Sequence, residues 1–219
     1  MNKSFTIILT VTMLFLAQDL FSYNIPWRIK SHNLNIYTLR KQITSWTRRG
    51  YTPVGLSYKN RKMHVFYIGN NVMKISRWQI RWYRSLRILK KGINKEMRRG
   101  YFPNGVSHAG NKFYVLFVKT PSGSRGWHFL PGGYNLYSLK RAIRPYIRKK
   151  YVPVGITSFK GRYWCLLVRI PGTKASYWKI STYRTRRQIQ RGVTNHLRNN
   201  FIPWGFLFRR NKVNILYIK

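Results

Sequence analysis

A five-residue pattern, an aromatic residue followed by x-Pro-x-Gly, occurs four times in this chain at a constant spacing of 50 residues. The four copies occupy residues 51–55, 101–105, 151–155 and 201–205. Apolar runs recur in the same register, at residues 63–68, 113–118, 163–168 and 213–218. Self-similarity at a fixed period is typical of repeat proteins, whose units bury their apolar faces on one another. The spacing therefore predicts four tandem repeats of about 50 residues.

A second pattern alternates between these repeats. The first and third share Trp27 and Trp127, while the second and fourth share the pairs Trp78/Trp178, Ile80/Ile180, Tyr83/Tyr183 and Gly92/Gly192. This alternation predicts the order A-B-A-B and a pseudo-twofold or pseudo-fourfold arrangement. The expected boundaries are 23–72 for repeat A1, 73–122 for B1, 123–172 for A2 and 173–219 for B2.

Within each repeat the periodicity predicts a strand, a helix and two further strands, which is an α+β fold of four β-α-β-β units. The first strand surrounds the Trp-x-Ile segment, and the helix shows an apolar stripe such as Leu39, Ile43 and Trp46. The second strand contains the Pro and Gly, which suits an edge or bulged strand. The continuous apolar run that follows suits a central strand.

Hydroxyl residues mark the expected helix starts, because their oxygens accept the free N–H groups of the first turn. The expected caps are Thr38, Ser85, Ser138 and Thr185. They place the B helices about one turn earlier in their repeats than the A helices. Pro145 is expected to kink the third helix or to end it early.

Residues 1–22 have the pattern of a secretory signal peptide, with Lys3 near the start and an apolar core of about 13 residues. They predict a secreted or periplasmic protein. A buried first helix and an uncleaved membrane anchor are the alternatives, although the core is short for a span of about 20 residues. The lone cysteine, Cys165, lies in an apolar run, which predicts a buried and inert thiol.

Charge excludes most enzyme classes. The chain has 43 lysines and arginines against two acidic residues, which gives a formal charge of +41. Removing residues 1–22 removes Lys3 and Asp19, so the formal charge stays at +41 and Glu96 is the one acid left. A Ser-His-Asp triad, a carboxylate pair and a carboxylate-rich Mg²⁺ or Ca²⁺ site all need more acids. The five histidines lack the spacing of zinc ligands. We therefore expect no catalytic residues, no cofactor and no metal.

Basic residues recur on one side of every predicted helix. Counting back from each Pro-x-Gly aromatic, the tenth and third positions are always cationic: Lys41, Arg48, Lys91, Arg98, Arg141, Arg148, Arg191 and Arg198. At about 100° per residue they project opposite the apolar stripe. Their neighbours widen the stripe: Arg40, Arg49, Lys90, Arg99, Lys140 and Lys149. An ordinary solvated face would mix glutamate with lysine, so these positions predict polyanion binding, with the four helices forming one positive platform.

Tryptophans divide into two groups. Trp27, Trp78, Trp127 and Trp178 recur with the repeat and are expected in the core. Trp82 and Trp204 do not recur, so they are better candidates for surface contact with bases or sugar rings.

The segment Gly-Tyr-Thr-Pro-Val-Gly-Leu-Ser at residues 50–57, followed by His-Val-Phe-Tyr-Ile at 64–68, resembles the bacterial tandem repeat domain found beside secreted serine hydrolases. The resemblance covers a few positions of all four repeats and implies an exported α+β scaffold without catalytic residues. The chain departs from that family in its basicity and in carrying no hydrolase domain. The helix followed by a Gly-Tyr strand is also similar to peptidoglycan-binding SPOR modules, whose repeat length differs.

The expected function is a secreted, non-enzymatic protein that binds a polyanion: DNA or RNA, an anionic lipid or glycolipid, or an acidic or sulfated polysaccharide. A matrix or sheath component that docks on an acidic partner protein is the first alternative. A membrane-active cationic protein is the second. No small-molecule substrate is expected, and the sequence does not define an oligomeric state.

Overall fold

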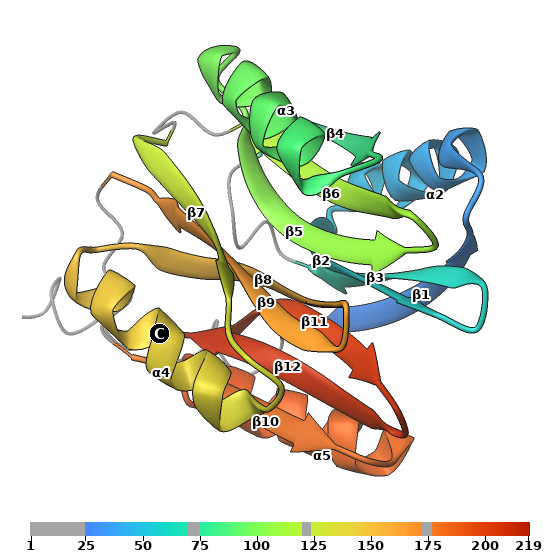
Figure 1. The fold of residues 1–219 in the computed structure, drawn as a ribbon. Coiled ribbons are helices and arrows are strands. Elements are labelled where there is room, and N and C mark those ends of the chain that lie inside the picture. Colours follow the sequence, from blue (N-terminus) through green and yellow to red (C-terminus); the bar gives the residue numbers. More distant parts are fainter. Residues whose placement is uncertain (1–24, 70–74, 120–123, 172–176) are drawn as a thin grey trace, which may run out of the picture.

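A computed structural model describes residues 25–69, 75–119, 124–171 and 177–219, and the predicted leader lies outside these ranges. The described residues form four α-helices and twelve β-strands (Figure 1). The helices are α2 (Ile36–Arg48), α3 (Leu86–Arg98), α4 (Leu136–Arg148) and α5 (Arg186–Arg198). The strands are β1 (Trp27–Asn33), β2 (Thr52–Lys59), β3 (Lys62–Ile68), β4 (Arg77–Tyr83), β5 (Phe102–Ala109), β6 (Lys112–Lys119), β7 (Gly126–Pro131), β8 (Val152–Phe159), β9 (Arg162–Arg169), β10 (Trp178–Tyr183), β11 (Ile202–Arg209) and β12 (Lys212–Ile218).

The strands form four antiparallel sheets of three strands, with the orders β1-β3-β2, β4-β6-β5, β7-β9-β8 and β10-β12-β11. The mixed α+β class and the repeating units are therefore confirmed. The strand with the continuous apolar run is central in every sheet, and the Pro-x-Gly strand is at an edge, as expected. A register shift follows the proline in every sheet and confirms the bulge: between Pro53 and Gly55, Pro103 and Val106, Pro153 and Gly155, and Pro203 and Gly205.

The four Pro-x-Gly strands meet at the centre of the molecule and close a ring. β2 packs against β5 and β11, and β8 packs against the same two strands. Their glycines touch in turn, because a Cβ built on Gly205 would lie 3.0 Å from the Cα of Gly155, and one on Gly55 would lie 3.1 Å from the Cα of Gly205. Glycine is needed here because two backbones approach within the space of a side chain.

Apolar packing follows the same ring. There are four buried apolar clusters, one at each junction between repeats. In each cluster the helix of one repeat packs on a face of its own sheet, and the sheet of the next repeat packs against them with its opposite face. The cluster around Val193 on α5 is completed by Phe66 and Ile68 of the first repeat, so the last unit packs on the first. Both faces of each central strand are thereby buried, which explains its unbroken apolar sequence.

All four helices begin at equivalent positions, which corrects the prediction that the B helices start a turn earlier. Ser85 and Thr185 cap their helices as expected. The A helices are capped by Asn35 and Asn135 instead of Thr38 and Ser138. The Asn35 side-chain oxygen accepts the Tyr37 and Thr38 N–H groups at 2.9 and 3.3 Å, because asparagine caps a helix as well as serine does.

The prediction that α4 ends early at Pro145 is wrong. The helix keeps the same 13 residues as the other three, and Pro145 is exposed near its last turn. Leu139 and Ile143 anchor the helix in the core, which outweighs the loss of one backbone hydrogen bond. Within the described ranges, no helix combines the length and apolar character that crossing a bilayer requires.

Candidate polyanion-binding surface

The eight cations of the predicted stripes are all exposed on the outer sides of the four helices: Lys41, Arg48, Lys91, Arg98, Arg141, Arg148, Arg191 and Arg198. The apolar stripes opposite them are buried, for example Leu39 and Ile43 on α2. Helical periodicity alone produces this division, because residues seven apart lie on one side of a helix.

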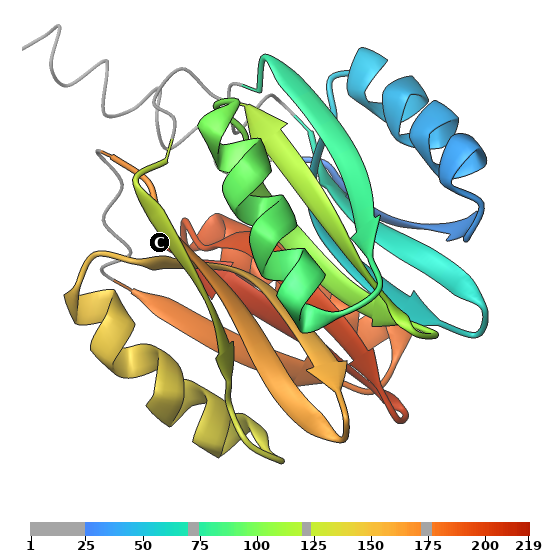
Figure 2. The same cartoon turned by 45° about the horizontal axis from the view of Figure 1, so that its top comes forward.

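These stripes do not form the single platform expected from the sequence. Both views show the helices at separate places around the outside of the molecule, with the sheets between them (Figures 1 and 2). The ring explains the difference, because successive helices cover successive sheets around it. Each helix therefore offers its own basic stripe, and a rigid ligand meets the stripes separately.

Several of the flanking cations have intramolecular contacts. The Arg40 guanidinium donates to the Ile80 carbonyl of the next repeat at 3.3 Å, and the Arg49 guanidinium lies 5.4 Å from the Trp46 ring centroid. Arg40 and Lys140 are half-buried, whereas Arg49, Lys90, Arg99 and Lys149 are exposed. Arg40 thus contributes to packing between repeats as well as to the surface charge.

Glu96, the one acidic residue of the described ranges, is buried on α3 with 5% of its surface exposed. Its carboxylate accepts from the Gln79 side-chain amide at 2.6 Å and lies 3.5 Å from the Arg81 Nε and 3.6 Å from an Arg99 nitrogen. This carboxylate is buried against Arg81 and Arg99, and among the described residues α2, α4 and α5 carry no acidic side chain.

We expect Glu96→Ala to lower the free energy of unfolding by about 1–3 kcal/mol, because two guanidiniums and an amide lose their shared acceptor. Solvent screens both half-exposed arginines and keeps the loss below that of a fully buried pair. Urea unfolding at pH 7 measures it. An unchanged urea midpoint would show that Glu96 does not hold these groups together.

Two depressions lie beside α5. One depression lies over its outer side and is lined by Arg187, Gln190, Arg191, Thr194, Asn195 and Arg198. A second, at the start of the helix, is lined by Thr182, Tyr183, Arg184, Gln188, Arg191 and Lys212. Arg191 belongs to both depressions. Guanidiniums beside side-chain amides and hydroxyls in a concave surface suit phosphate, sulfate or carboxylate oxygens.

The tryptophans follow the predictions in part. Trp27, Trp78, Trp127 and Trp178 are half-buried and pack against the apolar clusters. Trp82 is 38% exposed, and the Lys112 ammonium lies 4.3 Å from its ring centroid. Trp204 is half-buried rather than exposed: it packs against an apolar cluster at the ring, and its Nε1–H donates to the buried Asn104 at 2.5 Å.

Cys165 is buried as predicted, and burial raises the pKa of its thiol. His32 is buried and the other four histidines are half-buried. Burial lowers the pKa of each: His32, His64, His108, His128 and His196. For His196 the pKa falls to about 4, first because of burial and then because of the nearby Lys179 ammonium. Its ring lies 4.2 Å from that of Tyr217, and its Nε2 is 3.0 Å from the Ser181 hydroxyl.

Acid should destabilise the protein through these histidines. The unfolded chain binds protons below about pH 6.5, whereas folded His196 resists protonation down to about pH 4, so stability falls as the pH drops across that window. We expect His196 alone to contribute about 1–3 kcal/mol of the loss. Urea midpoints between pH 7.5 and pH 4 at constant ionic strength measure it.

The matched variant is His196→Tyr, since Tyr146 occupies the equivalent position of the third repeat. It should retain more of its stability at pH 4 than the parent does. A urea midpoint that stays constant or rises toward pH 4 would contradict the prediction.

No protein-family model matches this chain, and no curated protein matches it significantly. The resemblance of residues 50–57 to the bacterial tandem repeat domain therefore stays an expectation.

Sequence reasoning missed several cations that line hollows of the surface, namely Arg28, Lys30, Arg184, Arg186, Arg187 and Lys212. For Arg186 a signal was present. The other three repeats have Ile36, Leu86 and Leu136 at the equivalent position, so an arginine there breaks an apolar pattern. A charge in place of a repeated core residue marks a site where the packing changes.

Proposed function

We propose that this protein is a non-enzymatic binding protein that engages a polyanion through the basic stripes of its helices, with α5 as the main contact. The supporting observation is that all eight stripe positions are cationic and exposed, while the one described acid is buried against Arg81 and Arg99. A large excess of positive charge on a folded domain favours association with a polyanion. The depressions beside Arg191 add concave places for its oxygens.

The proposal includes a paired organisation of four β-α-β-β repeats in the order A-B-A-B, with pseudo-symmetry about the ring. Contacts inside the ring support the pairing. Ser57 of the first repeat accepts the Phe208 N–H at 2.8 Å, and the equivalent Thr157 accepts the His108 N–H at 3.0 Å. Gly92 and Gly192 give another pair, because a Cβ on either would clash with the ring of Tyr83 or Tyr183.

Export is part of the same proposal and is supported by the apolar leader over residues 1–22. N-terminal sequencing of the protein recovered from the medium or periplasm would identify a cleaved leader. Recovery with Met1 retained would contradict cleavage.

Binding of labelled duplex DNA, single-stranded DNA and heparin across a salt series tests the function. Five cations border the two α5 depressions: Arg184, Arg187, Arg191, Arg198 and Lys212. If a duplex contacts all five, log K should fall with log salt at a slope of about −4.5, since each neutralised phosphate contributes about −0.9. Weak and equal binding of all three ligands that vanishes by about 0.2 M salt would contradict the proposal. An acidic partner protein or an anionic lipid would then be the ligand to examine.

A further inference from the structure

The ring closes between the fourth and first repeats, and its packing there differs from the other three junctions. Where one repeat meets the next, Ile80, Phe129 and Ile180 of the incoming first strand are buried. The equivalent Ile29 of β1 is only half-buried against the cluster of α5. Ile189 is half-buried as well, although its counterparts on the other three helices are fully buried: Leu39, Leu89 and Leu139.

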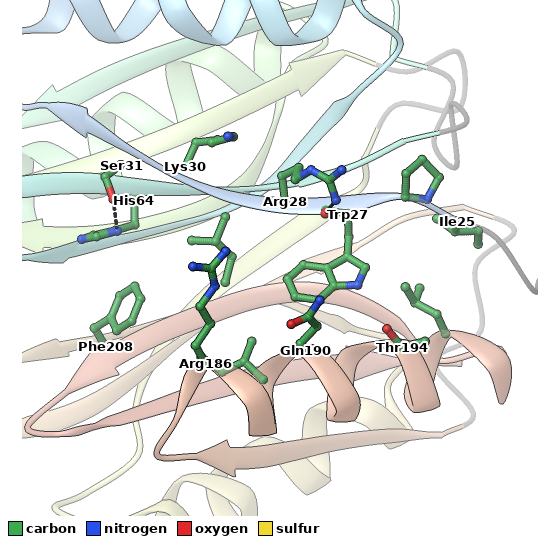
Figure 3. Close-up of a pocket in the computed structure, with 14 residues that line it drawn as sticks. Ile25, Trp27, Arg28, Lys30, Ser31, His64, Arg186, Gln190, Thr194 and Phe208 are labelled. Carbon is green, nitrogen blue, oxygen red and sulfur yellow. Dashed lines mark hydrogen bonds between the residues drawn. The ribbon is translucent and has the colours of Figure 1, made fainter.

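This loosened junction forms a groove of about 960 Å³ between β1 and α5 (Figure 3). Trp27 and Ile29 on β1, Ile189 and Leu197 on α5, and Phe208 supply its apolar lining. Three cationic residues border it: Arg28 and Lys30 of β1 and Arg186 of α5. Arg186 extends from the first turn of α5 toward β1, and none of the described residues that line the groove is acidic. The groove is therefore apolar inside, with Arg186 at its rim.

One wall of the groove is a sheet edge, since no described strand pairs with the outer side of β1. β1 is the outer strand of the order β1-β3-β2 and pairs with β3 in antiparallel register. The Gly69 N–H donates to the Pro26 carbonyl at 2.6 Å, which makes Pro26 part of a hydrogen-bonded pair. Hydrogen-bonded and non-hydrogen-bonded pairs alternate along an antiparallel ladder. The N–H and C=O groups of Trp27, Ile29 and Ser31 therefore point away from β3, at the edge of the sheet.

We propose that this groove binds an extended acidic peptide segment of a partner protein, which adds a strand to the free edge of β1. Main-chain hydrogen bonds to Ile29 and Ser31 supply the pairing, as in other β-augmentation complexes. An edge of seven residues spans about 23 Å, enough for a short segment. The proposal does not depend on the helix stripes, because Arg191 and Arg198 do not line this groove.

The side chains of β1 predict the residue pattern of the bound peptide. Trp27 and Ile29 project toward α5, and Lys30 projects to the opposite face, where its ammonium lies 5.0 Å from the Trp46 ring. The Arg28 guanidinium reaches the edge of β1 and donates to the Trp27 carbonyl at 2.9 Å. The side chains of a peptide strand paired with β1 alternate between the same two faces. Its apolar residues then enter the groove beside Ile189, and its acidic residues meet Arg28 and Lys30. The expected ligand alternates apolar and acidic residues.

The probe is a labelled Val-Glu-Val-Glu-Val-Glu-Val peptide, measured by fluorescence anisotropy with the full chain at about 0.3 M salt, which screens general charge attraction. It should bind at least about tenfold more tightly than a peptide of the same composition with the residues in blocks. N-methylation of the residues whose N–H groups face β1 should abolish binding, and N-methylation of the alternate residues should not. Equal binding of the blocked peptide, or insensitivity to the position of methylation, would overturn the proposal.

The variant that tests the groove is Arg186→Leu. It introduces the leucine that the second and third repeats have at the equivalent positions, Leu86 and Leu136, and it fills the groove. It should weaken peptide binding at least about tenfold and raise the melting temperature. Arg87→Leu removes the same charge at an exposed position of α3, outside the groove, and should change binding less than about threefold. An equal loss of peptide affinity in both variants would show that charge alone determines the binding. Preferential binding of DNA over the peptide at this salt, lost in Arg186→Leu, would assign the groove to nucleic acid instead.

Discussion

Gly205→Val is expected to destabilise the protein more than any other single change described above, by more than about 3 kcal/mol. The backbone of Gly205 has an ordinary conformation, so the effect is steric. A Cβ there would lie 3.0 Å from the Cα and 3.4 Å from the N of Gly155, and these are backbone atoms that cannot rotate away. The ring would have to open between the third and fourth repeats. A fall in melting temperature of about 6–12 °C in circular dichroism is the corresponding observation.

The control for this change is Gly110→Asn. Gly110 lies in a turn at φ +56° with nothing within 4 Å of an added Cβ, and asparagine tolerates that conformation. It should change the melting temperature by less than about 2 °C. The smaller variant Gly205→Ala should fall between the two. If Gly205→Val had the same melting temperature as Gly110→Asn, the contact between the glycines would not be what holds the ring closed.

Neutralising four stripe cations should reduce polyanion binding about a hundredfold at 0.1 M salt, because each lost phosphate contact weakens affinity and the salt slope together. The variant changes Lys41, Arg48, Arg141 and Arg148 to Gln. These residues are exposed on α2 and α4, so the fold should keep its melting temperature or gain from reduced self-repulsion. A long duplex or heparin chain is the suitable ligand, because the two helices lie at separate places on the molecule.

A second variant with the same loss of four charges separates the stripes from net charge. It changes Arg61, Lys62, Lys160 and Arg162 to Gln, which are exposed cations of the β2–β3 and β8–β9 hairpins in the same two repeats. Its affinity should fall less than about fivefold, through the smaller overall field alone. Equal losses in the two variants would mean that total charge determines the affinity for the polyanion. Unchanged affinity in the first variant would remove the α2 and α4 stripes from the interface.

Much of each repeat was predictable because its signals are local. The apolar stripe of Leu39 and Ile43 identified a helix, and the bulge at Pro53 and Gly55 followed from residues that cannot complete a regular ladder. The misplaced caps had a local cause too. Asn35 and Thr38 are both good capping residues, and their order along the chain does not show which one lies outside the first turn.

The candidate site was predictable only in part. Which cations point outward follows from the helical period, and the structure places Lys91 and Arg98 accordingly. The number of stripes that one ligand can touch depends on how the helices are arranged around the ring, and no period along the chain encodes that arrangement. Trp204 shows the same limit, because its partner Asn104 is 100 residues away.

Repetition at a period of 50 residues was enough to establish how many units there are and that each combines helix and strands, since these properties depend on neighbours along the chain. Closure of the ring through Gly55, Gly105, Gly155 and Gly205 required the folded molecule, because it depends on backbones from different repeats meeting in space. The groove beside Arg186 required it as well. A break in an apolar pattern shows that packing changes, but only the opposing strand β1 shows what space that change opens.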